Sequence, residues 1–283
     1  RIYEELEFYT ESEAQYRLAA DQDESTRLEL AAYLGRRAKI EESLQICSEL
    51  LSKETVRRIC AINNATAKYH GEQITPEQIQ QMLDWVAYGK KEYPDAWDLP
   101  TQEAFLLDSV GKTAEALDRL NEIPWDRLTE FEKGLIANNR AYLKLKIAQN
   151  DDQLYDDLEM AFEILGPQVE LLDTRAMASL QKGDCAEAIR DLKEATLFHP
   201  DSGRLTNFWR TGTHVAWDIT KGALVVRGVY QFHLALAYQC QDDKPAARAA
   251  LETAEALGFE ESDVNGSELT KYHELRRWLG YTE

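Results

Sequence analysis

The sequence predicts an all-helical protein in which short helix pairs stack side by side. Residues 171–200 contain two amphipathic helices that meet at Gly183, where the missing Cβ lets the chain turn, and that end at Pro200. Similar apolar and small residues recur in the same order in three other stretches. Ala38 and Gly111 lie 73 residues apart and Gly111 and Gly183 lie 72 apart, each close to twice a repeat of about 34 residues. These observations favour an α-solenoid of about six helix pairs.

The pairs can be placed in order along one superhelical domain that spans the whole chain. Residues 1–22 form a lead-in helix, residues 23–200 hold repeats 1–5, residues 228–258 hold repeat 6, and residues 259–283 form a C-terminal capping helix. The second and fourth repeats are the least regular. Thr75-Pro76 starts a helix in the second, and Thr129 with Glu132 predicts a capping box in the fourth. Ala38 and Asp242 take the place of the turn glycine in the first and sixth repeats.

Residues 201–227 break the regular spacing. They are rich in glycine and tryptophan, and Val215–Ile219 and Ala223–Arg227 flank Gly222 as the strands of a short hairpin would. The alternatives are a loop insertion, a flap over apolar surface, or a longer first helix. As an insertion, the segment would contact a partner or support self-association, through side chains that are costly to leave unpaired: Arg204, Trp209, Arg210 and Trp217.

The repeated residues resemble the tetratricopeptide repeat (TPR) family. The match in the clearest copy is carried by Leu172, Ala176, Gly183, Ala188, Leu192, Ala195 and Pro200. The resemblance implies that the first helices line a concave groove that binds a peptide or protein segment. Transferred position by position, it nominates these groove residues: Gln102, Phe105, Asn138, Asn139, Tyr142, Glu170, Asp173, Thr174, Met177, Gln181, Phe232, His233 and Leu236.

The net charge of the chain limits the classes of partner that are expected. The net charge is −19, and no basic stripe is present that would neutralise nucleic-acid phosphates. Glu170 and Asp173 favour a partner segment that carries basic and apolar residues, with Phe232 and Met177 as apolar contacts. Asn139 is singled out because an asparagine offers both a donor and an acceptor to an extended backbone.

Catalysis, metals and cofactors are not expected. The five histidines and four cysteines are dispersed, and no phosphate-binding glycine loop or metal-ligand spacing occurs. Cys47, Cys60, Cys185 and Cys240 each lie in an apolar helical pattern, which predicts buried free thiols and a cytoplasmic protein. No apolar run is long enough to span a membrane.

The sequence therefore predicts a non-catalytic, acidic scaffold or adaptor protein that binds another protein in its groove. The alternative is a regulatory or substrate-recruiting arm of a larger multidomain protein, such as an enzyme whose catalytic domain is absent here. The chain begins with Arg1 instead of Met, which suggests a fragment.

Overall fold

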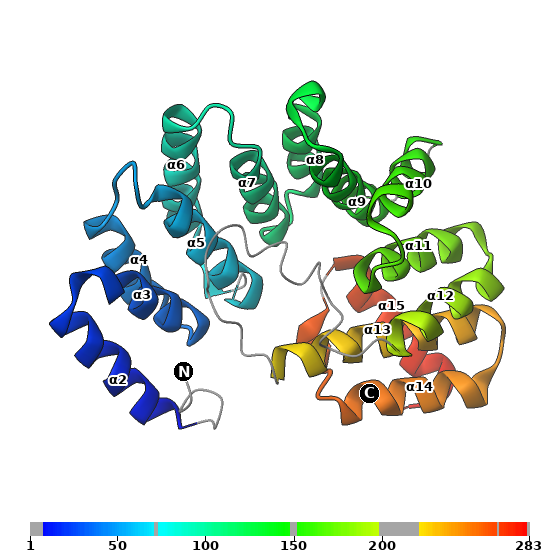
Figure 1. The fold of residues 1–283 in the computed structure, drawn as a ribbon. Coiled ribbons are helices and arrows are strands. Elements are labelled where there is room, and N and C mark those ends of the chain that lie inside the picture. The colour runs from blue at the N-terminus through cyan, green and yellow to red at the C-terminus, as the bar shows by residue number, and fades with distance from the viewer. Residues whose placement is uncertain (1–7, 71–72, 148–151, 198–220, 265, 282–283) are drawn as a thin grey trace. The chain divides into compact units, whose positions relative to one another are not determined.

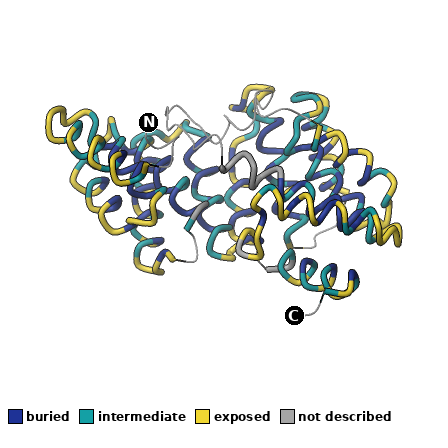
Figure 2. The backbone as a smooth tube through the Cα atoms, turned by 90° about the horizontal axis from the view of Figure 1, so that it is seen from below, coloured by how far each residue is buried: buried dark blue, intermediate teal, exposed yellow. Residues whose placement is uncertain are grey.

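A computed structural model describes residues 8–70, 73–147, 152–197, 221–264 and 266–281. Helices are the only regular elements in these ranges (Figure 1). They fall into two compact units, which we call unit 1, up to Leu128, and unit 2, from Thr129 onward. Most helices carry both buried and exposed residues, spaced by about one helical turn, while a few are buried or half-buried along nearly all of their described length (Figure 2).

Unit 1 consists of an N-terminal helix and three helix pairs. The helices are α2 (Tyr9–Gln22), α3 (Arg27–Arg36) with α4 (Ile40–Glu49), α5 (Val56–His70) with α6 (Pro76–Glu92), and α7 (Asp98–Ser109) with α8 (Thr113–Asn121). The described residues of this unit also include the 3-10 turns η1 (Glu24–Thr26) and η3 (Trp125–Arg127). The first helices pack in sequence, α3 on α5 and α5 on α7, around a core that includes Ile59, Met82 and Leu106.

Unit 2 repeats the arrangement and is closed by one more helix. Its helices are α9 (Glu130–Lys146) with α10 (Asp152–Leu165), α11 (Val169–Lys182) with α12 (Cys185–Leu197), α13 (Lys221–Cys240) with α14 (Lys244–Ala256), then η5 (Glu261–Asp263) and α15 (Gly266–Leu279). The helix α15 packs on α13 and α14 through Tyr272, Leu275 and Leu279. The predicted solenoid packing, with six helix pairs and a C-terminal capping helix, is therefore confirmed.

The four short turns within pairs share one backbone geometry. Gly111 and Gly183 have φ angles of 78° and 81°, and Ala38 and Asp242 each have 58°. After each of them, the next amide donates to the carbonyl five residues earlier, as in Lys39 to Leu34 and Asp184 to Ser179. This is the Schellman ending of a helix, which needs one left-handed residue. The turn positions assigned from the sequence are confirmed, including the two without glycine.

The α-helices α6 and α9 each begin with a capping box, of which the sequence predicts the one at α9 and only the helix start at α6. The Thr129 hydroxyl accepts from the Glu132 amide, and the Glu132 carboxylate accepts in return from the Thr129 amide. Thr75 and Gln78 form the same reciprocal pair at the start of α6, where Pro76 follows. These caps satisfy amides that the first turn of a helix leaves without partners.

The predicted hairpin is wrong in its second half. Residues 221–227 belong to α13, so the longer first helix is the alternative that holds there. Their apolar run continues directly into the helical pattern that follows, and one helix satisfies its own backbone groups without a partner strand. Residues 215–219 and the four candidate insertion contacts, Arg204, Trp209, Arg210 and Trp217, lie outside the described residues.

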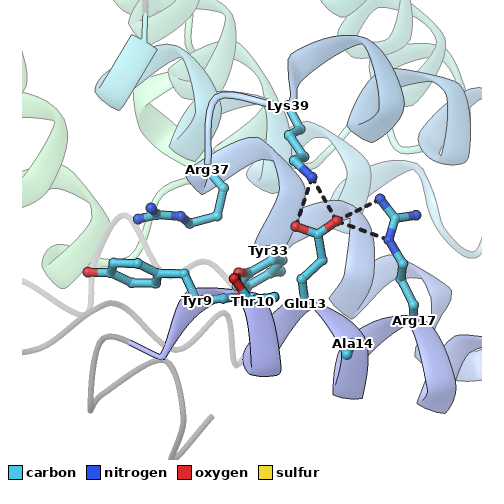
Figure 3. Close-up of a pocket in the computed structure, with 8 residues that line it drawn as sticks. All are labelled: Tyr9, Thr10, Glu13, Ala14, Arg17, Tyr33, Arg37 and Lys39. Carbon is cyan, nitrogen blue, oxygen red and sulfur yellow. Dashed lines mark hydrogen bonds and ion pairs between the residues drawn. The ribbon is translucent and has the colours of Figure 1, made fainter.

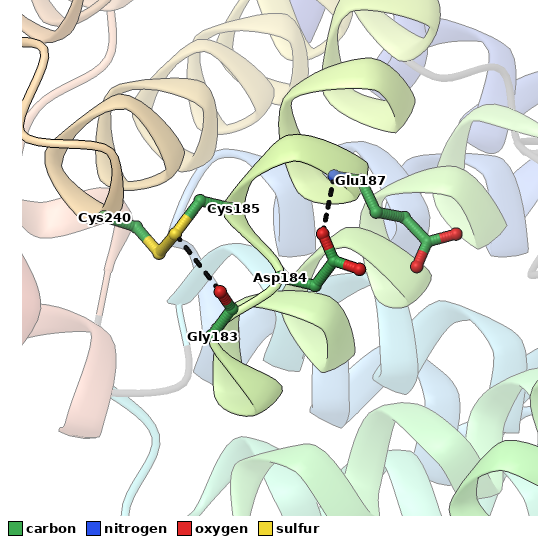
Figure 4. Close-up of a disulfide and its surroundings, with 5 residues drawn as sticks. All are labelled: Gly183, Asp184, Cys185, Glu187 and Cys240. Carbon is green, nitrogen blue, oxygen red and sulfur yellow. Dashed lines mark hydrogen bonds between the residues drawn. A yellow bond between two sulfur atoms is a disulfide. The ribbon is translucent and has the colours of Figure 1, made fainter.

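The prediction of four free thiols is wrong for two of them. Cys185 and Cys240 form a disulfide, with Cα atoms 5.6 Å apart, because the first residue of α12 lies beside the last residue of α13 (Figure 4). Cys47 and Cys60 are free and buried. Because disulfides persist mainly in oxidising compartments, the cysteines no longer support the predicted cytoplasmic location. No helix in the described ranges is long and apolar enough to cross a membrane.

Candidate protein-binding face

The first helices of unit 2 place polar side chains on neighbouring surfaces. The helix α11 packs against α9 and α13, and α15 packs against α13. Asp173 on α11, His233 on α13 and Glu268 on α15 meet there: His233 Nδ1 donates to Asp173 Oδ1 at 2.6 Å, and His233 Nε2 lies 3.4 Å from Glu268 Oε1. We call these three residues the acid–histidine cluster.

His233 is 3% exposed and carries a positive charge at neutral pH. Burial alone would lower its pKa, but the charge and hydrogen bond of Asp173, helped by Glu268, raise it to about 10. Burial conversely favours a higher pKa for Glu268, and the His233 hydrogen bond, with Lys146 and Lys271 nearby, lowers it. The cluster is therefore a buried cation held between two carboxylates.

Glu170 adds a further negative charge on α11. Burial raises the pKa of Tyr230 well above its ordinary value, and the charges of Glu170 and Asp173 raise it further. Tyr230 therefore stays neutral. The charged groups that act on His233 are the carboxylates of Asp173 and Glu268, and Lys146 and Lys271 act in turn on Glu268.

Buried asparagine side chains lack partners in both units. Asn139 on α9 is 7% exposed and its Nδ2 makes no hydrogen bond, while the neighbouring Asn138 has a buried, unbonded Oδ1. In unit 1, Asn63 on α5 is fully buried, and neither atom of its amide is bonded. Buried amides without partners are uncommon and require an explanation. Asn63 is not among the residues predicted from the sequence, although Asn63-Asn64 repeats the doublet Asn138-Asn139.

The other predicted groove residues in unit 2 range from exposed to buried. Tyr142 is 43% exposed, and the exposed Gln181 donates to the Leu145 carbonyl at 3.1 Å. Met177 is half-buried against the unit 2 core. Thr174 is buried and donates to the Glu170 carbonyl one helical turn earlier.

Phe232 and Leu236 are core residues in this structure. Phe232 is fully buried, stacked on Phe259 with ring centres 5.1 Å apart and edge-on to Tyr272 at 5.8 Å. Leu236 is also buried. Both side chains fill the space between helices, so they are not offered to a partner.

The two candidates in unit 1 lie on α7. Gln102 is buried and donates to Asp98 at 3.4 Å, and Phe105 is half-buried against the unit 1 core. Asp98 itself is held by the guanidinium of Arg57 at 2.9 Å. The Arg57–Asp98 pair joins α5 to α7, and Gln102 bonds to the same carboxylate within α7.

Comparison with known proteins adds information on the fold alone. No protein-family model matches the sequence, and no curated protein matches it. Among solved structures, the fold is similar to the crystal structure of the APC/C hetero-tetramer Cut9-Hcn1, with a TM-score of 0.57 and 12% identity. The match covers 96% of this chain, which spans 47% of the matched chain. The likeness supports an all-α fold of stacked helix pairs, consistent with TPR-like repeats.

Proposed function

We propose that this chain is a protein-interaction scaffold of the TPR type, which binds a basic segment of another protein on the first-helix face of unit 2. The observation that carries the proposal is the side-by-side placement of unbonded asparagine amides on α9 and an excess of carboxylates on α11 and α15. Amides of this kind suit the backbone of an extended peptide, and the carboxylates suit its lysine or arginine side chains.

Within this proposal the residues have different roles. Asn139 and Asn138 would bond the peptide backbone, Glu170 would contact a basic side chain, and the exposed ring of Tyr142 would supply apolar contact. Asp173 and His233 would hold α11 and α13 in place. Phe232 and Leu236 are left out because they pack within the apolar core of unit 2, and Thr174 is left out because its hydroxyl is bonded within the fold.

A capture experiment followed by measured affinity tests the proposal. Partners are retained from extract on the immobilised chain, identified, and a basic segment of the best one is titrated as a labelled peptide. We expect Asn139→Ala and Glu170→Gln each to weaken binding about tenfold, which corresponds to one lost hydrogen bond to a charged or buried group. Glu159→Gln on α10 removes an exposed carboxylate outside this face and serves as the matched control.

Added salt should weaken the same complex, because ion pairs between partly exposed groups are screened. Equal affinity of the wild type and both face variants would contradict the assignment of this face. An acidic partner peptide that binds as well as the basic one would contradict the assigned charge.

A further inference from the structure

A pocket of about 550 Å³ lies in unit 1 between α2 and the turn that ends α3. Figure 3 shows the side chains that line it: Tyr9, Thr10, Glu13, Ala14, Arg17, Tyr33, Arg37 and Lys39. None of them belongs to the face proposed above. The volume falls within the roughly 300–1,000 Å³ that is common for small-ligand sites.

The lining is positively charged although the chain is acidic. Arg17, Arg37 and Lys39 share the pocket with a single carboxylate, Glu13, whereas the whole chain carries a net charge of −19. A local excess of positive charge raises the concentration of anions at that place.

Arg37 is a rigid and available donor. Its guanidinium carbon lies 3.6 Å from the centre of the Tyr9 ring, and its side chain pairs with no carboxylate in the described part of the chain. Stacking on a ring restrains the guanidinium while leaving the N–H groups on its edge free. The Tyr33 hydroxyl donates to the Tyr9 backbone carbonyl at 2.8 Å, which ties α2 to α3 and holds this wall of the pocket.

Glu13 shows that an oxyanion fits beside the other two cations. Lys39 Nζ donates to its two oxygens at 2.7 and 2.8 Å, and Arg17 donates to it at 2.9 and 3.0 Å (Figure 3). Arg17 also pairs with Glu42 at 2.6 Å. An ammonium group has three donors, so Lys39 keeps one for a further acceptor.

We propose that this pocket binds the oxyanion of an organic ligand, a phosphate or carboxylate, with Arg37 and Lys39 as donors and the Tyr9 and Tyr33 rings against the ligand body. The three cations, the free guanidinium edge and the aromatic walls meet in one cavity large enough for such a molecule. Glu13 competes with the ligand for Lys39.

Calorimetric titration of the full chain with phenyl phosphate tests this site. We expect saturable binding that is about tenfold weaker in Arg37→Ala, the loss of one charged hydrogen bond. Glu13→Gln should strengthen binding severalfold because it releases Lys39 and Arg17. A loss of folding stability in this variant would weaken binding, so a stronger affinity cannot be explained by it. Arg127→Ala, an exposed arginine of the same unit paired with Asp95, is the matched control and should bind as the wild type does.

One further probe, compared with phenyl phosphate, distinguishes the source of the oxyanion. A phosphotyrosine peptide that binds more tightly than phenyl phosphate indicates a modified protein partner, and equal affinity of the two indicates a small molecule. The proposal is overturned if phenyl phosphate binds neither the wild type nor Glu13→Gln at millimolar concentration, or if Arg37→Ala binds it unchanged.

Discussion

His233 links three helices of unit 2 through one buried charge. Its carboxylate neighbours are Asp173 and Glu268. Removing the imidazole leaves carboxylates without their cation, which in a buried pair costs about 3 kcal/mol or more. The stabilising role of His233 can therefore be measured separately from any role in binding.

The stabilisation from His233 should depend on pH with a defined sign. Its folded pKa of about 10 lies above the unfolded value of about 6.5. The native state then binds the proton more tightly, so the contribution is complete below the unfolded pKa and is lost as pH rises through the folded one. Urea unfolding of the wild type and His233→Gln should show the largest free-energy difference below the unfolded pKa of about 6.5 and a shrinking one as pH rises toward 10 (about the folded pKa). A difference that stays constant would show that His233 acts only by packing.

Ala38 and Asp242 hold positive φ angles without being glycine. A side chain in the left-handed region costs about 1 kcal/mol that glycine avoids. We expect Ala38→Gly and Asp242→Gly each to raise the free energy of unfolding by about this amount. Gly111→Ala, at the equivalent turn, should lower it by a similar amount, because an added Cβ meets no other atom within 4 Å and only backbone strain acts. Equal stabilities in urea titration would contradict this account.

The disulfide acts at the level of helices, because it joins the start of α12 to the end of α13 across 55 residues of sequence. In the chain-entropy model, closing a loop of this length stabilises the fold by about 4 kcal/mol. Reduction, or Cys185→Ser, should therefore lower the melting temperature of the oxidised chain. The double variant that also carries Cys240→Ser should match the single one, and an unchanged melting temperature would rule out a stabilising role.

Thiol reactivity provides a separate check on the disulfide. Burial raises the pKa of the Cys47 and Cys60 thiols to about 12, which keeps them protonated and unreactive. The native oxidised chain should give almost no reaction with a thiol reagent, and mild reduction should expose two reactive groups. Four rapid reactions before reduction would contradict the disulfide.

At the scale of the whole chain, negative charges repel one another. The chain has 51 aspartates and glutamates and 32 lysines and arginines. Even with every lysine and arginine paired to one carboxylate, many carboxylates keep a negative charge that no cation neutralises. Raising the ionic strength from about 0.01 M to about 0.1 M shortens the screening length from about 30 Å to about 10 Å. We expect thermal unfolding to shift upward by roughly 3 °C, equivalent to about 1 kcal/mol in a chain of this size. A downward shift would show that surface ion pairs outweigh the repulsion.

The helix pairs could be predicted from the sequence because their signals are local. Small residues such as Ala176 and Ala188, turn residues such as Gly183, and the Thr129 cap act within one or two helical turns. The second strand predicted at residues 223–227 failed for the same reason, since a short apolar run after glycine has no local signal that separates a strand from the start of a helix.

The sequence alone determined the order and spacing of the helix pairs and the turns within them, including those at Ala38 and Asp242, because backbone geometry there depends on neighbouring residues. Only the tertiary structure brought Asp173 to His233 across 60 residues, joined Cys185 to Cys240, buried Phe232 and gathered Arg37, Lys39 and Tyr9 around one pocket. Each of these depends on which faces of distant helices pack together. The helix faces that pack together are those whose contact buries the most apolar surface, summed over many side chains. No single position in the sequence therefore indicates which faces these are.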